Sequence, residues 1–465
     1  MATANESKTS PIGEVRIYDA PTQSKIWEAV PTGTPLIAKE IIEFEYIESI
    51  YDSFVRANMS IFESSGAFEK AFNGCGVRNF CMIEVVQFND PLKDTDDSTR
   101  TRKDLSFTGA NCFFVSKVRQ IIQNKKQIYE LELVTRDALT SLASNVLSTW
   151  PPNESTKIDY NFIVEDILKR WIYATKKLDV QEDKSKPTTK YNGNGMQPFQ
   201  VIHDICSKAT SVRWSSSGTQ EETGATGYMF FERYDAYKFT SVASLINLSA
   251  GEEAKESHRY KIIAANSSET TPKEQAYSIL SYKFNDDEQT SDVIQEIRSK
   301  KRGKPATFVL DPHGQVFKKI ESLDPIKDPC EVTSVDKSFV RNTYKEVGYY
   351  EYSAYNSCSN ELDNEPLSVA LTSLNYSALL EELRTRNSVL RVNGNFDISS
   401  GDKIYITVPE IKGDGASATS PSDKYSGTYV VTKVAHRLEN YKFLYTDLVI
   451  AKIKDKSGAT VKVPQ

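Results

Sequence analysis

The sequence predicts a β-rich α+β protein that has a β-domain near each end of the chain and helical and irregular segments between them. Three observations lead to this fold class. Short β-branched and aromatic runs separated by turn residues fill residues 35–136 and 388–452. Two segments within these regions resemble each other in sequence. The clearest amphipathic helix pattern lies between the two regions.

Length and composition narrow the class of protein. The 465 residues suggest about three domains, because a single core rarely grows beyond about 250–300 residues. The net charge of −6 argues against a dedicated nucleic-acid-binding protein, which normally carries a basic balance. Apolar residues make up 39% and charged residues 26%, as in globular chains. No apolar run approaches a membrane span and the N-terminus lacks a signal-peptide core, so no membrane insertion is expected.

The six cysteines are spread over nearly 300 residues and form no C-x-x-C pair. They are Cys75, Cys81, Cys112, Cys206, Cys330 and Cys358. A disulfide scaffold needs a higher density of cysteines in a shorter chain. We therefore expect free thiols in a chain that folds in a reducing cytoplasm.

The N-terminal third reads as an extended arm followed by strands. Residues 1–34 contain three prolines and no sustained period, which predicts the arm. The expected strands of the next region are residues 41–47, 56–62, 80–88, 112–120 and 127–134. The mixed charges of residues 93–104 predict a solvated loop.

The middle of the chain predicts two helices and a hairpin. Apolar residues recur with helical spacing from Tyr160 to Trp171, and Asp159 is placed to cap that helix. A polar connector, residues 181–196, leads to a second helix that opens at Pro198. Residues 228–232 and 237–241 then predict a β-hairpin.

Strands return in the last 190 residues. They are expected at residues 277–285, 306–310, 388–392, 403–408, 428–437 and 442–452. Residues 325–374 read as irregular and Tyr-rich, and residues 377–385 as a short helix. The segment 412–427 is rich in Gly, Ser and Ala and long for a hairpin loop.

Residues 114–130 and 430–446 align without a gap at an offset of 316. The identical pairs are Val115/Val431, Lys117/Lys433, Val118/Val434, Asn124/Asn440, Lys126/Lys442 and Tyr129/Tyr445. Two hairpins can share such residues by chance through common strand preferences. The alternative, which we favour, is two related β-domains with the middle of the chain inserted between them. A trimer of such a chain would present six similar units.

No catalytic, cofactor or metal site is expected, and the chain is predicted not to be an enzyme. The four histidines lie at least 55 residues apart and fit no zinc-enzyme spacing; they are His203, His258, His313 and His436. Asp94, Asp96 and Asp97 begin like a calcium loop, but Thr99 and Leu105 occupy its glycine and glutamate positions. Dinucleotide and phosphate-binding glycine motifs are incomplete or missing.

Two charged features have a plain structural reading. His203 is expected on a helix surface, and the neighbours Glu381 and Glu382 point about 100° apart on a helix, which does not suit a catalytic pair. The acidic-then-basic run of residues 286–304 reads as a solvated helix that suits the helix dipole. The alternative interpretation of this charged run is an electrostatic docking patch for a partner.

The hairpin and the C-terminal strands carry a family resemblance. Within residues 199–244, the matching hairpin residues are Phe230, Phe231, Glu232, Asp235, Tyr237 and Phe239. Ala236 departs from a glycine of the pattern, which puts the turn type in question. With the C-terminal strands, the chain resembles the baseplate hub proteins of contractile-tailed, T-even-like and cyanophage-type bacteriophages over most of residues 35–455. The same barrel pattern recurs in type VI secretion spikes and tail-tube proteins.

The resemblance implies a domain plan of two tail-tube-like β-barrels. The plan is an N-terminal arm at 1–34, a first barrel at 35–139, a helical and hairpin domain at 140–274, a second barrel at 275–320 plus 386–456, and an insertion with a short helix at 321–385. The second barrel is therefore split in sequence, and the inserted segments would contact neighbouring proteins.

The resemblance also implies a structural function. The hub would be a homotrimeric ring that joins the sixfold tail tube to the threefold central spike of a contractile injection machine. Its partners would be the spike, the tail-tube or tube-initiator protein, the tape measure protein and wedge proteins. DNA would pass through the channel without specific binding. The location would be the tail baseplate of the virion, after assembly in the host cytoplasm.

Two other functions compete with the hub. A surface- or carbohydrate-binding tail protein would use the 24 tyrosines for ligands. An enzymatic hub would hydrolyse peptidoglycan. The repeat and the order of the motifs weigh against the first alternative, and the lack of a catalytic constellation weighs against the second.

Overall fold

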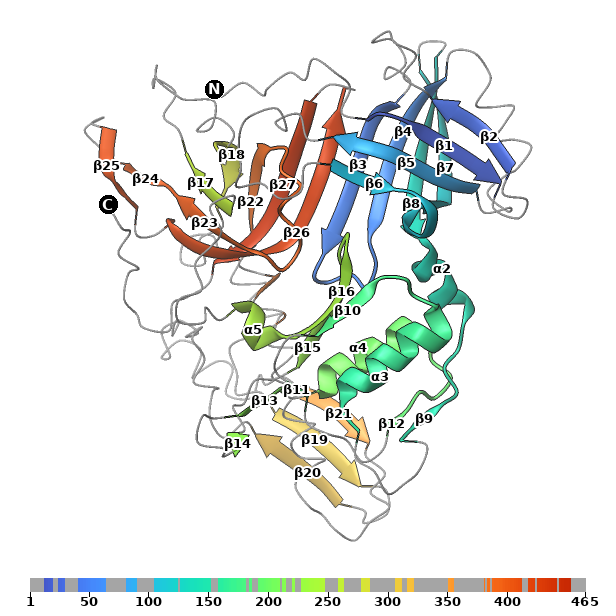
Figure 1. The fold of residues 1–465 in the computed structure, drawn as a ribbon. Helices are drawn as coiled ribbons and strands as arrows, with labels where there is room; N and C mark the ends of the chain where they lie inside the picture. Colours follow the sequence, from blue (N-terminus) through green and yellow to red (C-terminus); the bar gives the residue numbers. More distant parts are fainter. Residues whose placement is uncertain are drawn as a thin grey trace.

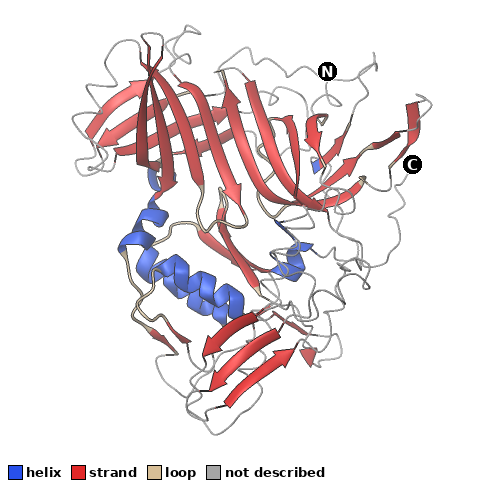
Figure 2. Ribbon diagram, turned by 180° about the vertical axis from the view of Figure 1, so that it is seen from behind, coloured by secondary structure: helices blue, strands red, loops and turns tan. Residues whose placement is uncertain are grey.

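The computed structural model shows a protein dominated by strands. It describes residues 12–19, 24–29, 41–63, 81–89, 104–123, 126–151, 158–180, 184–185, 191–209, 211–214, 220–221, 227–246, 258–262, 277–284, 306–311, 316–321, 350–354, 380, 383–384, 387–411, 417–422, 425–440 and 443–452. A large curved sheet forms one layer, and a smaller helical layer packs beside it (Figures 1 and 2). Within these residues, none of the helices has the length and apolar character needed to span a membrane.

The large sheet has fourteen strands and joins the two ends of the chain. Its order is β18 (Ile279–Lys283), β22 (Asn387–Asn393), β27 (Phe443–Lys452), β26 (Gly427–Glu439), β3 (Ile41–Ser49), β4 (Arg56–Glu63), β8 (Lys126–Thr135), β7 (Phe113–Gln123), β5 (Cys81–Asn89), β1 (Val15–Asp19) and β2 (Ser24–Ala29). Three strands lie off this path: β6 (Asp104–Phe107) pairs with β5, β23 (Lys403–Thr407) with β26, and β17 (Arg259–Lys261) with β23.

The sheet contains the same order of strands twice. The first series is β3-β4-β8-β7-β5-β1, and the second series is β18-β22-β27-β26-β23-β17. Each series has a buried cluster of apolar side chains, and the cluster of the first series also includes Leu438 of β26 and Leu444 of β27. The series differ at their last pair, which is antiparallel between β1 and β5 but parallel between β17 and β23. They meet where β26 pairs with β3, next to each other in Figure 1.

Matching β-bulges support the correspondence. The register of β7 against β8 shifts at Ser116, and that of β26 against β27 shifts at Thr432, 316 positions later. A second pair of shifts lies between Ile41 and Glu43 in β3 and between Ile279 and Ser281 in β18. Because a bulge fixes the twist and phase of a strand, these shared positions indicate equivalent strands.

The structure corrects the sequence alignment of the repeat by one residue. Lys117 pairs with Glu132, whereas Lys433 pairs with Val449, so the offset is 316 in the first strand and 317 in the second. Tyr129 therefore corresponds to Thr446, not to Tyr445. The turn after β26 is one residue longer than the turn after β7, and Asn440 adopts a positive φ of 50° in it.

The helical layer follows the predicted pattern closely. Helix α3 (Tyr160–Ile167) continues as a π-helical turn, η4 (Leu168–Ile172), and α4 (Pro198–Lys208) starts at its proline. Asp159 occupies the predicted N-cap position, but only its backbone oxygen accepts bonds. The hairpin strands β15 (Tyr228–Glu232) and β16 (Ala236–Ser241) share an apolar core with these helices, and β10 (Lys177–Val180) pairs parallel to β16.

The remaining elements are short. They are η3 (Gly109–Asn111), α2 (Arg136–Ala143), β9 (Thr149–Trp150), β11 (Lys184–Ser185), β12 (Tyr191–Asn192), β13 (Ser211–Trp214), β14 (Gln220–Glu221), α5 (Val242–Ile246), β19 (Ala306–Asp311), β20 (Val316–Glu321), β21 (Tyr350–Ala354), β24 (Pro409–Ile411) and β25 (Ser417–Pro421). Strands β19, β20 and β21 form a separate small sheet.

Several segments differ from the sequence-based expectation. Part of the expected arm forms β1 and β2, because Val15 and Ile17 alternate into the first core. β21 lies in the segment expected to be irregular, and β25 lies in the expected loop 412–427. Most of the expected loop 93–104 and of the expected helix 377–385 lies outside the described residues. The domain boundaries stay predictions.

Candidate functional site at the hairpin junction

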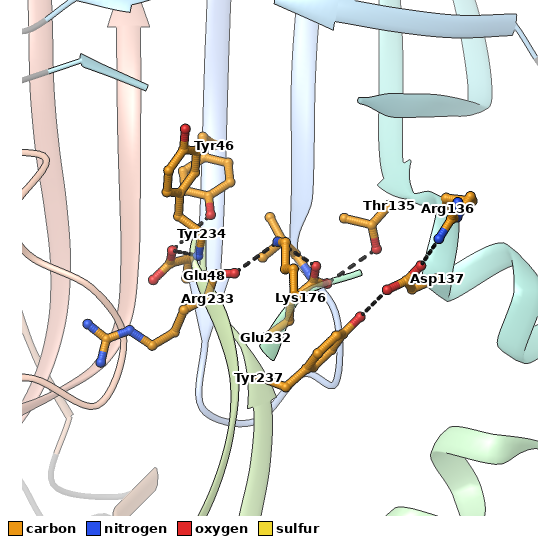
Figure 3. Close-up of polar contacts among 11 residues, drawn as sticks. Tyr46, Glu48, Thr135, Arg136, Asp137, Lys176, Glu232, Arg233, Tyr234 and Tyr237 are labelled. Atoms are coloured by element: carbon orange, nitrogen blue, oxygen red, sulfur yellow. Dashed lines mark hydrogen bonds and ion pairs between the residues drawn. The ribbon is translucent and has the colours of Figure 1, made fainter. Parts of the chain in front are cut away.

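The tip of the β15–β16 hairpin enters a buried polar region where the two strand series meet the helical layer (Figure 3). The turn is closed by the Arg233 amide, which donates to the Ala236 carbonyl oxygen at 2.8 Å. Ala236 is not among the described non-glycine residues with positive φ, so its backbone is unstrained at the position where the hairpin pattern of the resemblance has a glycine. We call the polar residues that hold this tip the junction: Glu48, Lys176, Glu232, Arg233, Tyr234 and Asp402.

Glu48 of β3 binds three parts of the chain at once. Its carboxylate accepts hydrogen bonds from the Tyr46 hydroxyl at 2.8 Å, the Tyr234 amide at 2.7 Å and the Ser400 amide at 3.0 Å. Glu48 is buried. Because a buried carboxylate needs several donors, this arrangement fixes the first series, the hairpin and the second series relative to one another.

Arg233 ties the hairpin tip to the second series. Its Nη2 donates to Asp402 Oδ1 at 3.0 Å, and Asp402 Oδ2 accepts from the Ser399 amide at 2.9 Å. Burial works to lower the pKa of Arg233, but the neighbouring Asp402 and Glu48 raise it above its usual value. The guanidinium therefore stays charged, and the pair is a fixed structural contact.

Glu232 holds the opposite side of the tip. It accepts from Lys176 Nζ at 2.7 Å, the Val55 amide at 2.9 Å and Thr135 Oγ1 at 3.2 Å. Lys176 also donates to the Arg233 carbonyl oxygen at 2.9 Å. Burial raises the pKa of Glu232, although Lys176 and the Val55 amide oppose that rise.

Two tyrosines complete the attachment. The Tyr234 hydroxyl donates to the Ser106 carbonyl oxygen and lies 3.1 Å from the Ser106 amide. Tyr237 donates to Asp137 Oδ2 at 2.8 Å, and Asp137 also lies 3.5 Å from Arg136 (Figure 3). Burial raises the pKa of Tyr237 well above its usual value, so its hydroxyl remains a donor.

Next to the junction, β26 and β3 form what we call the seam. The seam is antiparallel and runs from Lys433 opposite Ser49 to Leu438 opposite Phe44. His436 stacks on the Tyr46 ring at a centroid distance of 6.1 Å, and Arg437 Nη2 lies 2.5 Å from Glu45 Oε1. The seam thus has an apolar buried face and a charged pair on its other face.

The described residues arrange no reactive constellation. They contain no group of three or more His, Cys, Asp or Glu side chains able to hold a metal ion. The carboxylates of the junction are occupied by donors, which suits structural support rather than proton transfer. His203 is exposed on α4, as predicted, with Nε2 2.7 Å from Ser53 Oγ. His313, Glu381, Glu382, residues 94–99 and residues 286–304 lie outside the described residues.

Sequence reasoning found Glu232 through the hairpin motif but missed Glu48, Lys176 and Asp402. Glu48 does carry a signal. In β3, alternate residues are buried, namely Phe44, Tyr46 and Glu48. An acidic side chain at a buried position of such an alternation implies a buried partner. Lys176 and Asp402 carry no such pattern.

Comparisons with known proteins give structural neighbours only. No family model and no curated protein matches the chain. The fold is similar to a tail protein from Neisseria meningitidis MC58, with 8% identity, a TM-score of 0.46 and coverage of 95% of this chain and 98% of that one. A prophage MuSo2 tail protein from Shewanella oneidensis has 7% identity, a TM-score of 0.43 and the same coverages.

A third neighbour is an E. coli component of the type VI secretion system. That protein is described as structurally similar to the T4 bacteriophage tail proteins gp27 and gp5. It shares 9% identity with this chain at a TM-score of 0.39, over 89% of this chain and 73% of its own length.

Proposed function

We propose that this chain is a non-enzymatic structural hub subunit of a contractile phage tail baseplate. Three copies form a ring that connects the sixfold tail tube to the threefold central spike. The observation that carries the proposal is the double series of strands joined by the seam. A chain that contains two equivalent units makes six units in a trimer, and six units match a sixfold tube.

The junction supports this function because a hub has to hold its two units at a fixed angle. Glu48, Arg233 and Asp402 connect the series through buried charge-assisted hydrogen bonds that a flexible linker would lack. The partners are the spike and a tail-tube or tube-initiator protein, with the tape measure and wedge proteins as further contacts. The resemblance of the hairpin and C-terminal strands to phage hubs is the second line of support.

The acidic balance fits a DNA channel. Three chains of −6 each carry a formal −18, and like charges would let DNA pass without adhesion. We place the protein in the tail baseplate of the virion, after assembly in the host cytoplasm.

Light scattering coupled to gel filtration tests the proposal, with and without a co-expressed spike protein. We expect a species of three times the 52.3 kDa chain mass and rings with a central hole in negative-stain images. A strictly monomeric species under both conditions would refute the hub function.

A further inference from the structure

The helix formed by α3 and η4 ends at a tyrosine in an unusual backbone conformation. Tyr173 has a φ of 55° and a ψ of 40°, and its amide and that of Ala174 both donate to the Leu168 carbonyl oxygen. Glycine is the usual residue at such a helix end, and a bulky side chain there is a genuine outlier. Burial of the ring does not offset this cost, because Tyr173 is 69% exposed. An exposed outlier of this kind points to a function for the side chain.

A second aromatic residue is exposed on the same helix. Phe162 of α3 is 53% exposed. Two ion pairs with i, i+4 spacing lie between it and Tyr173, one from Glu165 to Lys169 and one from Asp166 to Arg170. Because residues three and four apart are neighbours on a helix, the two rings and the ion pairs form one continuous surface.

The ion pairs of this surface present their basic partners outward. The side chain of Arg170 is 60% exposed and that of Asp166 only 16%. Arg136 of α2, whose Nη2 donates to the Tyr173 carbonyl oxygen at 2.9 Å, is 39% exposed, whereas its partner Asp137 is 8% exposed. A partner therefore meets positive charge first, although the whole chain carries −6. We call these residues the helix-end surface: Arg136, Phe162, Lys169, Arg170 and Tyr173.

We propose that the helix-end surface docks an acidic segment of another tail protein, with the Tyr173 ring as its central apolar anchor. The inference rests on the proposed place of this chain in a phage tail. Tyrosine and arginine are enriched among the residues that dominate the binding energy of protein interfaces. The bonds to the Leu168 carbonyl oxygen hold the Tyr173 backbone in place before docking, which lowers the entropy lost on binding.

The chemistry of the surface favours a protein segment over a nucleic acid. Each of its three cations already contacts a carboxylate, which weakens the attraction for a phosphate backbone. An arginine has five N–H donors, and Arg170 contacts Asp166 through Nη1, so its other donors can bind a carboxylate of the partner. Phe162 and Tyr173 add apolar area that suits apolar side chains of the same segment.

Photo-crosslinking in purified tails identifies the occupant. The full chain carries p-benzoylphenylalanine in place of Tyr173, the tails are irradiated, and the adduct is mapped by mass spectrometry. We expect an adduct with a different tail protein, at a segment where Asp and Glu outnumber Lys and Arg. The same probe in place of Tyr282, an exposed tyrosine on β18, is the control and should not give this adduct.

The crosslinking outcomes separate this inference from the hub proposal. Tails that contain the chain but give no adduct, or give adducts to DNA, to a second copy of the chain or to a basic segment, would overturn the docking and leave the hub function standing. Tails that lack the chain would overturn both.

Glycine at position 173 separates docking from folding. Tyr173→Gly removes the ring and suits the left-handed backbone, so the urea midpoint of the purified chain should equal or exceed that of the wild type. A lower midpoint would show that the ring supports the fold and would overturn the inference.

A labelled synthetic peptide of the crosslinked segment measures the affinity by fluorescence anisotropy. Tyr173→Gly and Arg170→Glu should each weaken its binding roughly tenfold or more, because each removes an anchor of the surface. Tyr282→Ser, which removes an exposed tyrosine elsewhere, should leave the affinity unchanged. Equal affinities of the wild type and Tyr173→Gly would overturn the role of the ring.

Discussion

Replacing Lys176 by methionine tests whether the junction depends on a buried ion pair. Lys176 Nζ lies 2.7 Å from Glu232 Oε1, and their side chains are only 12% and 1% exposed. At an effective dielectric constant of 20, their attraction is about 6 kcal/mol, much of which offsets the cost of desolvation. Removing one partner of a buried pair typically costs roughly 3–5 kcal/mol, and we expect Lys176→Met to lower the free energy of unfolding by that amount at pH 7.5.

The pH dependence follows from Glu232. Burial already raises its pKa, and loss of Lys176, which opposes that rise, raises the pKa further. A carboxyl group whose pKa is higher in the folded than in the unfolded protein stabilises the fold most at pH values below its unfolded pKa of about 4.3. This stabilisation is lost as the pH rises through the folded pKa. Because Glu232 can take up a proton, the free-energy cost of leaving it without Lys176 is limited to about 1.4 kcal/mol for each pH unit above 4.3. The deficit of Lys176→Met should therefore shrink to about 1 kcal/mol at pH 5.

Urea denaturation followed by circular dichroism at pH 5 and pH 7.5 measures this difference. In Lys176→Met/Glu232→Gln, the amide oxygen can still accept from the Val55 amide and Thr135, so roughly 2 kcal/mol should return at pH 7.5. Lys169→Met removes an exposed partner of Glu165 and should cost less than about 1 kcal/mol. A Lys176→Met deficit equal at both pH values, or no larger than that of Lys169→Met, would refute the reasoning.

Two further changes test local packing. Gly401 has a φ of +81°, and an added Cβ would lie 2.9 Å from Phe231 Cζ, so Gly401→Ala should lower stability by roughly 1–3 kcal/mol. Gly109→Ala, with a φ of +59° and open space, should cost less in the same melts. Burial raises the pKa of the Cys112 thiol to about 12 and raises that of Cys206. Peptide mapping should find both unalkylated in native protein at pH 8 and alkylated in urea; rapid native labelling would contradict their burial.

The strands and helices that were predicted from the sequence share a regular repeat of apolar residues that extends over several positions. β4 alternates buried and exposed residues, and α3 repeats its apolar residues every three to four positions. β1 escaped detection because only Val15 and Ile17 alternate before the prolines resume. The sequence repeat was recognised from the residues of β7 and β26. The turn after β26 is one residue longer than the turn after β7, and an alignment without gaps cannot show that difference.

The junction shows why part of the site could not be predicted. Glu48 and Ser400 are 352 positions apart, and Arg233 and Asp402 are 169 apart. No local pattern specifies such pairs, because only the folded sheet brings β3 beside β26. Glu232 could be found from the sequence because its motif is local. Glu48 could have been found because it continues the alternation of buried residues in β3.

The seam and the junction constrain the two strand series in different ways. Strand pairing fixes the register of two units, but the angle between neighbouring strands varies from about 10° to 35°, so register alone leaves the curvature of the sheet undetermined. The hairpin tip supplies the missing constraint, because Glu48 and Asp402 hold it against both series at once.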